Sequence, residues 1–420
     1  MIFKASIHMR IRSSAIPLLF AVIPAAAFGQ LNTTNFVVLG EGLAAGMADF
    51  SLRDVYQAQS FPAQIAGQLK TAFPQPLIEP PGLGGGAPGF PNVEVTLPNR
   101  GMSSAREIFP PQLFVFNLSV PGLKLADSAG RRPVRPMVQK TDAMQTMINM
   151  ILGYPAITLA STVPLWSQSE YAVAMNPSMA LVELGYYDVL DAAVKGDVTL
   201  LPDATTFQTN YTKLLSTIGV SRPTIVVTTV PNPFDTAYFT TLTGATRLLG
   251  AAPADLINLY GLKSDDLITI PGLMAIGSQL TTGTPGVLPA GSIVSGSVAS
   301  QVTARVAALN TAINAAATAS NALVYDLGGF FSRLRTQGVT VGTQQLTADY
   351  LGGIYSLDGY YPGTTAHSLI ANEILTLLNS KFGTSYALVN VVTQSASDPA
   401  LRFRPAVRKA KSPNVIGGKQ

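Results

Sequence analysis

Short runs of apolar residues recur along the chain, and their composition predicts strands buried on both faces. Each run is rich in β-branched or aromatic side chains and shows no alternation of polar and apolar positions. The runs cover residues 35–39, 113–118, 179–184, 224–230 and 322–327. Such runs are typical of a parallel sheet covered by helices on both sides.

Segments with helical periodicity lie between these runs. Apolar residues repeat every three or four positions within 61–69, 144–151, 302–313 and 370–377. Strands that alternate with helices predict an α/β fold with a doubly wound parallel sheet, and in such sheets the ligand site lies beyond the carboxyl ends of the strands. The residues that follow each apolar run are therefore the first candidates for function.

Two stretches interrupt this alternation and are expected to be insertions. Residues 79–101 contain a proline- and glycine-rich sequence, with no preceding strand and no following Lys-Ser/Thr to indicate a nucleotide-binding loop. Residues 232–298 are longer than a crossover connection needs, and a lid over the strand ends is one expected arrangement for them.

The first 29 residues have the pattern of a signal peptide. Lys4, Arg10 and Arg12 precede a short apolar stretch, and small residues up to Gly29 offer a cleavage site. The apolar stretch is short for a membrane span. We therefore expect export, to a secreted or periplasmic location, of a protein whose main domain covers residues 30–395.

Composition narrows the chemistry further. The chain is 47% hydrophobic and 12% charged, and it has no cysteine, which excludes disulfides, zinc–thiolate sites and cysteine nucleophiles. Residues 30–399 carry a net charge of −5, whereas residues 400–420 hold six basic groups and no acidic one. We expect 396–420 to be a disordered basic tail, usually only a solvated end, with contact to an anionic envelope polymer as the alternative. No nucleic-acid partner is expected, and the oligomeric state is left open.

Four short blocks follow the predicted strands in order. They read Gly40-Glu41-Gly42-Leu43, then Asn117 to Gly122, then Gly185-Tyr186-Tyr187-Asp188, and finally Asp358-Gly359-Tyr360-Tyr361-Pro362. In this order the blocks resemble those of the SGNH (GDSL) hydrolases, a family of esterases and lipases. The resemblance spans roughly residues 35–385 and implies a flavodoxin-like, five-stranded parallel sheet.

The resemblance also assigns family roles to single positions, and most of these positions are substituted. The family's nucleophilic serine falls on Gly42, its oxyanion-hole asparagine on Tyr187, and its catalytic histidine on Tyr361. Gly122 matches the family's oxyanion glycine, and Asp358 matches the acid that orients the histidine.

These substitutions remove the family's mechanism. Ester cleavage by this route needs a hydroxyl nucleophile and a base within hydrogen-bond reach. Glycine has no side-chain oxygen, and a phenol with a pKa of about 10 is a poor base near neutral pH. The residues therefore predict a catalytically degenerate protein.

One alternative is an active esterase with a relocated constellation. His367 is the only histidine beyond the expected signal peptide, and Ser119 and Ser356 are the serines near the strand ends. We expect His367 to cap or pack the last helix and both serines to be ordinary loop residues. A second alternative is a structural envelope protein that attaches through its basic tail.

Four tyrosines take the place of the lost machinery. Tyr186, Tyr187, Tyr360 and Tyr361 are expected to converge on the crevice together with Glu41, Gly42, Gly122 and Asp358. They either fill the crevice by aromatic packing or line a cleft for a small-molecule, glycan or lipid ligand. Glu41, Asp188 and Asp358 lie on three separate loops, so neither a metal site nor a cofactor is expected.

Overall fold

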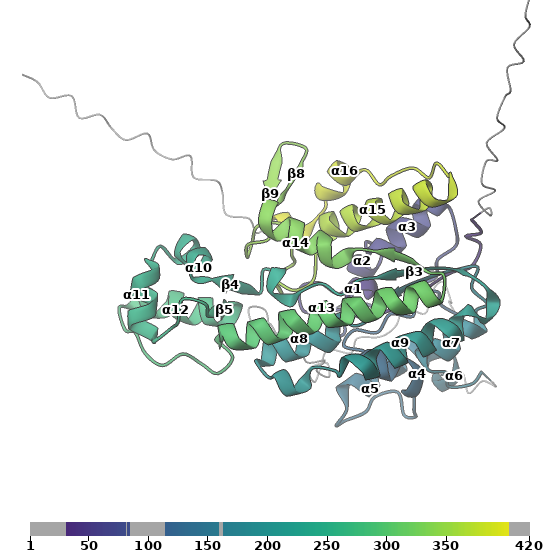
Figure 1. Cartoon of the computed structure of the whole chain (residues 1–420), viewed down its shortest axis with the longest axis horizontal. Coiled ribbons are helices and arrows are strands. Elements are labelled where there is room, and N and C mark those ends of the chain that lie inside the picture. Colours follow the sequence, from purple (N-terminus) through teal and green to yellow (C-terminus); the bar gives the residue numbers. More distant parts are fainter. Residues whose placement is uncertain (1–30, 81, 85–113, 159–162, 403–420) are drawn as a thin grey trace, which may run out of the picture.

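The computed structural model describes residues 31–80, 82–84, 114–158 and 163–402. The expected signal peptide, nearly all of the insertion at 79–101 and most of the basic tail lie outside these residues. The described part is a mixed α/β structure built around a parallel sheet (Figure 1). None of its helices is long and apolar enough to cross a membrane.

The central sheet has four parallel strands in the order β1-β2-β3-β7. Their bounds are Phe36–Gly40 for β1, Met179–Glu183 for β2, Thr224–Thr228 for β3 and Leu323–Tyr325 for β7. Every residue of β1 and β2 is buried. Four of the five apolar runs are thus confirmed as strands with both faces covered, as their lack of alternation predicted.

The one remaining predicted strand, residues 113–118 and second along the chain, is not formed as a regular strand. Its described part makes a single parallel bridge, between Asn117 and Val38 of β1. The Val38 N–H donates to the Phe116 carbonyl at 2.8 Å, and the Leu118 N–H donates to the Val38 carbonyl at 2.9 Å. The ladder stays short because the Phe116 N–H is directed to the Pro74 carbonyl and the chain turns away at Pro121.

Helices cover both faces of the sheet (Figure 1). On one side α3 (Phe61–Leu69) packs against α15 (Thr364–Phe382). On the other side lie α4 (Leu125–Gly130), α7 (Gln168–Ala174), α8 (Tyr186–Lys195), α9 (Ala204–Ile218) and α13 (Gly296–Ala319). All four helices predicted from periodicity are present, since the segment around 144–151 forms α5 (Ala143–Leu152).

Further helices and a hairpin complete this part of the structure. They are α1 (Gly42–Ala45), α2 (Asp54–Gln57), α6 (Tyr154–Thr158) and α14 (Leu327–Gln337), with the hairpin β8 (Val339–Val341) and β9 (Gln344–Leu346).

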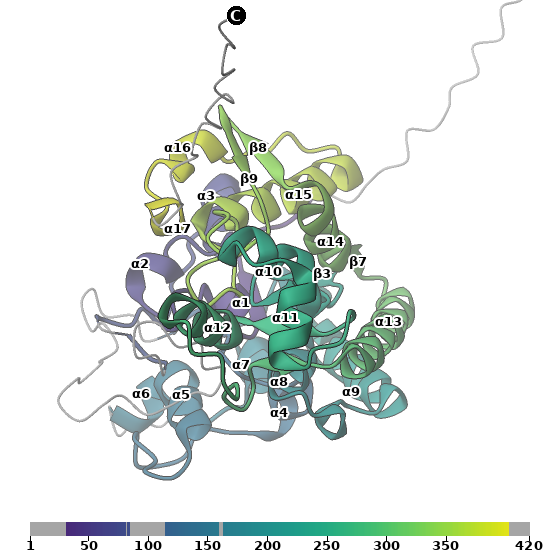
Figure 2. The same ribbon diagram turned by 90° about the vertical axis from the view of Figure 1, so that its left-hand side faces the viewer.

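The insertion at 232–298 folds into a small unit with its own core. Antiparallel strands β4 (Phe239–Thr241), β5 (Leu267–Thr269) and β6 (Ile293–Val294) combine with α10 (Leu242–Leu249), α11 (Pro253–Tyr260) and α12 (Ile270–Thr282). Leu256, Ile268 and Ile276 are fully buried within it. The unit projects from one end of the molecule (Figures 1 and 2). Its base covers the loop of the fourth block, because the Tyr238 N–H donates to the Gly359 carbonyl at 2.9 Å.

The C-terminal boundary placed at residue 396 is too early. Two short helices, α16 (Val391–Ser395) and α17 (Pro399–Arg402), follow α15. Asp398 between them is buried, and its carboxylate accepts hydrogen bonds from the Thr365 N–H at 2.7 Å and the Ala400 N–H at 2.9 Å. These bonds order the chain through Arg402, where sequence composition alone indicated a tail.

Candidate functional site

The blocks that follow the strands meet at one place in the fold. The ring of Tyr361 lies 6.3 Å from that of Tyr186 and 5.1 Å from that of Tyr360. The Tyr186 hydroxyl donates to the Tyr360 carbonyl at 3.0 Å, which ties the third block to the fourth. The first block joins them through Gly42. Three of the four tyrosines expected to converge therefore lie together, and all three are almost completely buried.

Tyr361 occupies the space next to Gly42 of the first block. A Cβ atom added to Gly42 would lie 2.3 Å from the phenol oxygen and 2.5 Å from Cζ of Tyr361. Gly42 opens α1 in ordinary helical backbone, so steric contact rather than backbone strain excludes a larger residue. Any side chain at this position requires Tyr361 to move.

Glu41 fixes the phenol of Tyr361 in this position. Its Oε2 accepts a hydrogen bond from the Tyr361 hydroxyl at 2.8 Å, and its Oε1 accepts one from the Leu43 N–H at 2.8 Å. The second bond makes Glu41 the N-cap of α1. Burial raises the pKa of Glu41 to about 7, although these hydrogen bonds favour the charged form.

A second buried carboxylate, Glu183, lies beneath the first block and was not singled out from the sequence. It ends β2, and its Oε2 accepts from the N–H groups of Glu41 and Ala44, both at 3.2 Å. Burial and the neighbouring charge of Glu41 raise the pKa of Glu183 well above its usual value. An acidic residue at the end of an otherwise apolar run was the available signal, because a carboxyl group in that position is buried only if it is hydrogen-bonded.

Asp358 shapes the loop of the fourth block. Its Oδ1 accepts from the N–H groups of Tyr360 at 3.0 Å and Tyr361 at 2.8 Å. The turn requires glycine at position 359, where φ is +77° and a Cβ atom would lie 2.5 Å from a side-chain carbon of Ile270. Burial raises the pKa of Asp358 to about 7. Its hydrogen bonds give this carboxylate a role in holding the loop.

His367 packs between helices, as expected from its position in the sequence. It lies in the first turn of α15, and its Nδ1 accepts from the Phe61 N–H, the first amide of α3, at 3.2 Å. Its ring stacks on Phe61 with a centroid distance of 5.9 Å. Burial lowers the pKa of His367 to about 3, and its Nε2 has no hydrogen-bond partner among the described residues. The imidazole caps α3 and makes no hydrogen bond with Asp358.

The two candidate serines differ in their hydrogen bonding. The Ser356 hydroxyl accepts from the Asp49 N–H at 3.0 Å. Ser119 is buried, and its hydroxyl has no partner in the described part of the chain. Neither serine forms a hydrogen bond with His367, so the structure does not assemble a nucleophile and base from these residues.

Tyr187 differs from the other three tyrosines because it borders an open pocket. The pocket has a volume of about 380 Å³ and lies between the start of α4, the start of α5 and the start of α8. Of the residues predicted to line the crevice, Gly122 and Tyr187 line this pocket. The other lining residues lie outside the four blocks.

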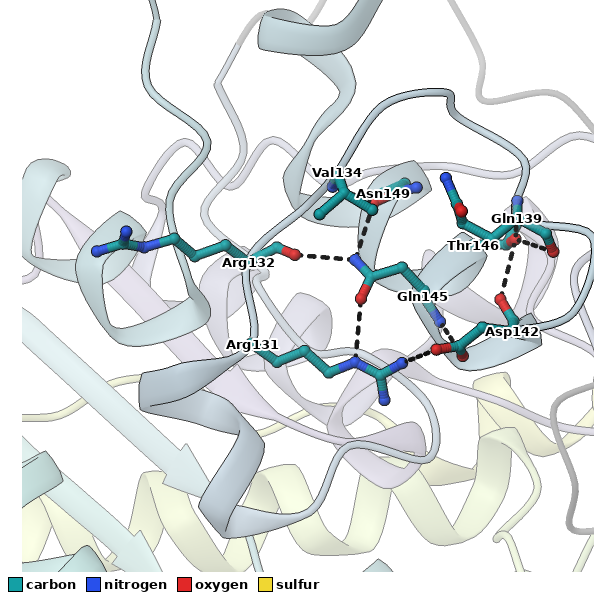
Figure 3. Close-up of polar contacts among 8 residues, drawn as sticks. All are labelled: Arg131, Arg132, Val134, Gln139, Asp142, Gln145, Thr146 and Asn149. Carbon is teal, nitrogen blue, oxygen red and sulfur yellow. Dashed lines mark hydrogen bonds and ion pairs between the residues drawn. The ribbon is translucent and has the colours of Figure 1, made fainter.

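A network of polar side chains holds one wall of this pocket (Figure 3). Arg131 forms an ion pair with Asp142, and its Nε donates to the Gln145 Oε1 at 3.1 Å. Asp142 in turn caps α5 through its Oδ1, which accepts from the Gln145 N–H at 2.8 Å. Asn149 closes the network by accepting from the Val134 N–H at 2.8 Å. The loop from 131 to 142 is therefore fixed on α5.

The opposite wall is held by the third block. Asp188 accepts a hydrogen bond from the Leu125 N–H at 3.0 Å, and Lys124 forms an ion pair with Asp191 at 3.0 Å. Burial raises the pKa of Asp188 to about 6. These contacts fix α4 against α8 beside Tyr187.

Among the described residues, packing and hydrogen bonds join the strand-end blocks. No three side chains of the kinds that bind metals come together among the described residues. Neither a scan of protein-family models nor a search of curated proteins gives a match to this chain.

Proposed function

We propose that this protein is an exported, non-catalytic relative of the SGNH (GDSL) hydrolases that binds a ligand beside the former active site. The observation that carries the proposal is the position of Tyr361. Its phenol fills the space where the side chain of a nucleophile at position 42 would begin, 2.3 Å from the added Cβ atom. A crevice filled in this way has neither a nucleophile nor room for an ester.

The fold supports the family assignment to the extent that the strand-end blocks meet. In this proposal the segment around Asn117 acts as the fifth strand of a flavodoxin-like sheet, at the outer edge of β1. Three backbone hydrogen bonds support it, the third joining the Val120 N–H to the Gly40 carbonyl at 3.1 Å. The strand order of the sheet would then place the second block beside the first, as the family's arrangement requires.

The binding part of the proposal rests on the pocket beside Tyr187. Tyr186, Tyr360 and Tyr361 are buried and offer no surface to a ligand, whereas Tyr187 borders an open volume of about 380 Å³. That volume falls within the range of pockets that hold small molecules, roughly 300–1,000 Å³. Aromatic packing thus accounts for three tyrosines and ligand binding for the fourth.

We expect the natural protein to show no turnover of short- and medium-chain nitrophenyl esters, and no labelling by a fluorophosphonate. The triple substitution Gly42→Ser/Tyr187→Asn/Tyr361→His restores the family's hydroxyl, oxyanion donor and base. It should give measurable hydrolysis, with the label mapped by peptide mass spectrometry to the serine introduced at position 42.

The control for this experiment is the double variant Tyr187→Asn/Tyr361→His, which lacks the introduced serine and should stay inactive. Turnover by the natural protein that is lost in His367→Ala would refute the proposal and support the esterase with a relocated base. In that case the labelled serine identifies the nucleophile.

Export is tested separately. Expression of the full chain in a bacterial host should yield a processed protein that begins at Gln30, seen as the loss of residues 1–29 by intact mass and N-terminal sequencing. Recovery of the unprocessed chain from the cytoplasm would contradict export without bearing on the site.

A further inference from the structure

The walls of the pocket beside Tyr187 carry balanced charges. Lys124 and Arg131 contribute two cations, and Asp127 and Asp142 contribute two carboxylates. Because the charges balance, the pocket offers no net attraction to a phosphate, a carboxylate or a polyamine. Its polar groups instead suit a ligand that is neutral and rich in hydroxyl groups.

Several of these groups retain hydrogen-bonding capacity. The Nη1 atom of Arg131 has no partner among the described residues, because the ion pair with Asp142 uses Nη2 and the bond to Gln145 uses Nε. The side chain of Asp127 likewise forms no hydrogen bond within the described chain and is partly exposed. A carboxylate that accepts and a guanidinium that donates can together bind neighbouring hydroxyls of one ring.

The arrangement is also rigid on both sides. Arg131 is fixed by the network on α5 (Figure 3), and Lys124 is fixed by Asp191 on α8. Tyr187, a residue that is 9% exposed, adds an aromatic side chain to the lining, and Met144 adds an apolar one. Fixed polar groups beside an aromatic ring lower the entropic cost of binding a rigid ring.

We infer that this pocket binds one residue of a neutral sugar chain. The inference rests on the proposed function, since it names the ligand class for the same site. Asp127 and Arg131 hold the hydroxyls of the sugar ring, Thr141 and Lys124 extend the polar contacts, and Tyr187 packs against the apolar face of the ring.

The test uses the full mature chain and a panel of neutral oligosaccharides, namely hexamers of glucose, mannose, xylose and N-acetylglucosamine. Binding is measured by saturation-transfer NMR and calorimetry. We expect at least one hexamer to bind, Asp127→Asn and Tyr187→Ala to weaken it about tenfold each, and Tyr187→Phe, which keeps the ring, to weaken it less than threefold. Asp255→Asn on α11 is a matched control that should leave binding unchanged.

Other outcomes overturn the inference. Absence of binding by every hexamer at millimolar concentration contradicts it, as does hexamer binding that is insensitive to Asp127→Asn and Tyr187→Ala. Inorganic phosphate or dodecanoate binding in this pocket with sensitivity to Arg131→Gln would assign it to an anion or an acyl chain. All of these results are independent of ester turnover, so failure of the sugar assignment is distinguishable from failure of the non-catalytic proposal.

Discussion

Gly42→Ser should lower the free energy of unfolding by about 1–3 kcal/mol, the usual cost of inserting atoms into a packed core. The added Cβ atom would lie 2.3 Å from the Tyr361 hydroxyl oxygen, far inside van der Waals contact. Tyr361 has no free space to enter, because Tyr186 and Tyr360 pack against its ring and Glu41 holds its hydroxyl. The loss is measured by chemical denaturation.

The effects of substitutions at positions 42 and 361 on the free energy of unfolding should be coupled. An imidazole ends before the phenol oxygen, so Tyr361→His removes the atom that approaches position 42 most closely. The double variant Gly42→Ser/Tyr361→His should therefore be more stable than the sum of the single effects predicts, by about 0.5–3 kcal/mol. Strictly additive single effects would contradict the steric account.

A glycine elsewhere supplies the control. Gly67 lies on the exposed face of α3, and a Cβ atom added there meets nothing within 4 Å. Gly67→Ser introduces the same side chain at a helical position without a clash, so it should not destabilise the fold.

Glu41→Gln should make the protein progressively more stable relative to the natural chain as the pH rises. The folded-state pKa of Glu41 is raised to about 7 from an ordinary 4.5, so the folded chain binds more protons than the unfolded chain between these values. Its stability therefore falls across this window as the pH rises. A shift of this size corresponds to about 3 kcal/mol.

The amide can replace the carboxylate in the local hydrogen bonds. Its oxygen accepts from the Leu43 N–H, and its nitrogen donates to the phenol oxygen of Tyr361 in place of the bond now donated by Tyr361. The variant thus loses a buried charge, while the Tyr361 hydroxyl hydrogen loses its acceptor at a cost that is the same at every pH. The prediction is a difference in unfolding free energy between variant and natural chain that increases from pH 4.5 to above 7.

The difference in unfolding free energy between the variant and the natural chain is the quantity to measure, because other groups also titrate between pH 4.5 and 7. Asp358 and Asp188, with pKa values raised to about 7 and 6, lower stability as the pH rises. His367 acts oppositely, because its pKa is lowered to about 3 and its contribution is lost as the pH falls below its ordinary 6.5. The contributions of Asp358 and His367 cancel in the comparison, whereas Glu183, whose pKa the charge of Glu41 raises, and Asp188, which interacts with Glu41, form part of the measured difference. A flat difference would contradict the burial of a titrating Glu41, and the exposed Glu79→Gln controls for removal of surface charge.

The fold could be predicted from the sequence where local pattern decides structure. Non-alternating runs became buried strands, and helical periodicity located α3, α5, α13 and α15. The run at 113–118 has the same composition as the others. Whether a run forms a regular strand, however, depends on which backbone groups bond to each of its two edges. One of these edges bonds to Pro74, a contact that no local pattern shows.

The site was predictable only in part, for a similar reason. The strand-end blocks identified Gly42, Tyr361 and Asp358, because the residues that follow parallel strands meet at one edge of a sheet. They did not indicate that Tyr361 would reach into the space beside Gly42, 319 residues earlier in the chain. The pocket residues Arg131 and Asp142 carried no motif, since their positions depend on hydrogen bonds to α5.

The contact between Gly42 and Tyr361 also limits how substitutions can accumulate. A chain that acquires a side chain at position 42 first passes through an overpacked and less stable protein. A chain that first replaces Tyr361 by a smaller residue opens the space and can then accept a change at position 42. Both first steps lower stability, one by overpacking and the other by leaving a cavity and an unpaired Glu41 carboxylate, so we expect positions 42 and 361 to change together.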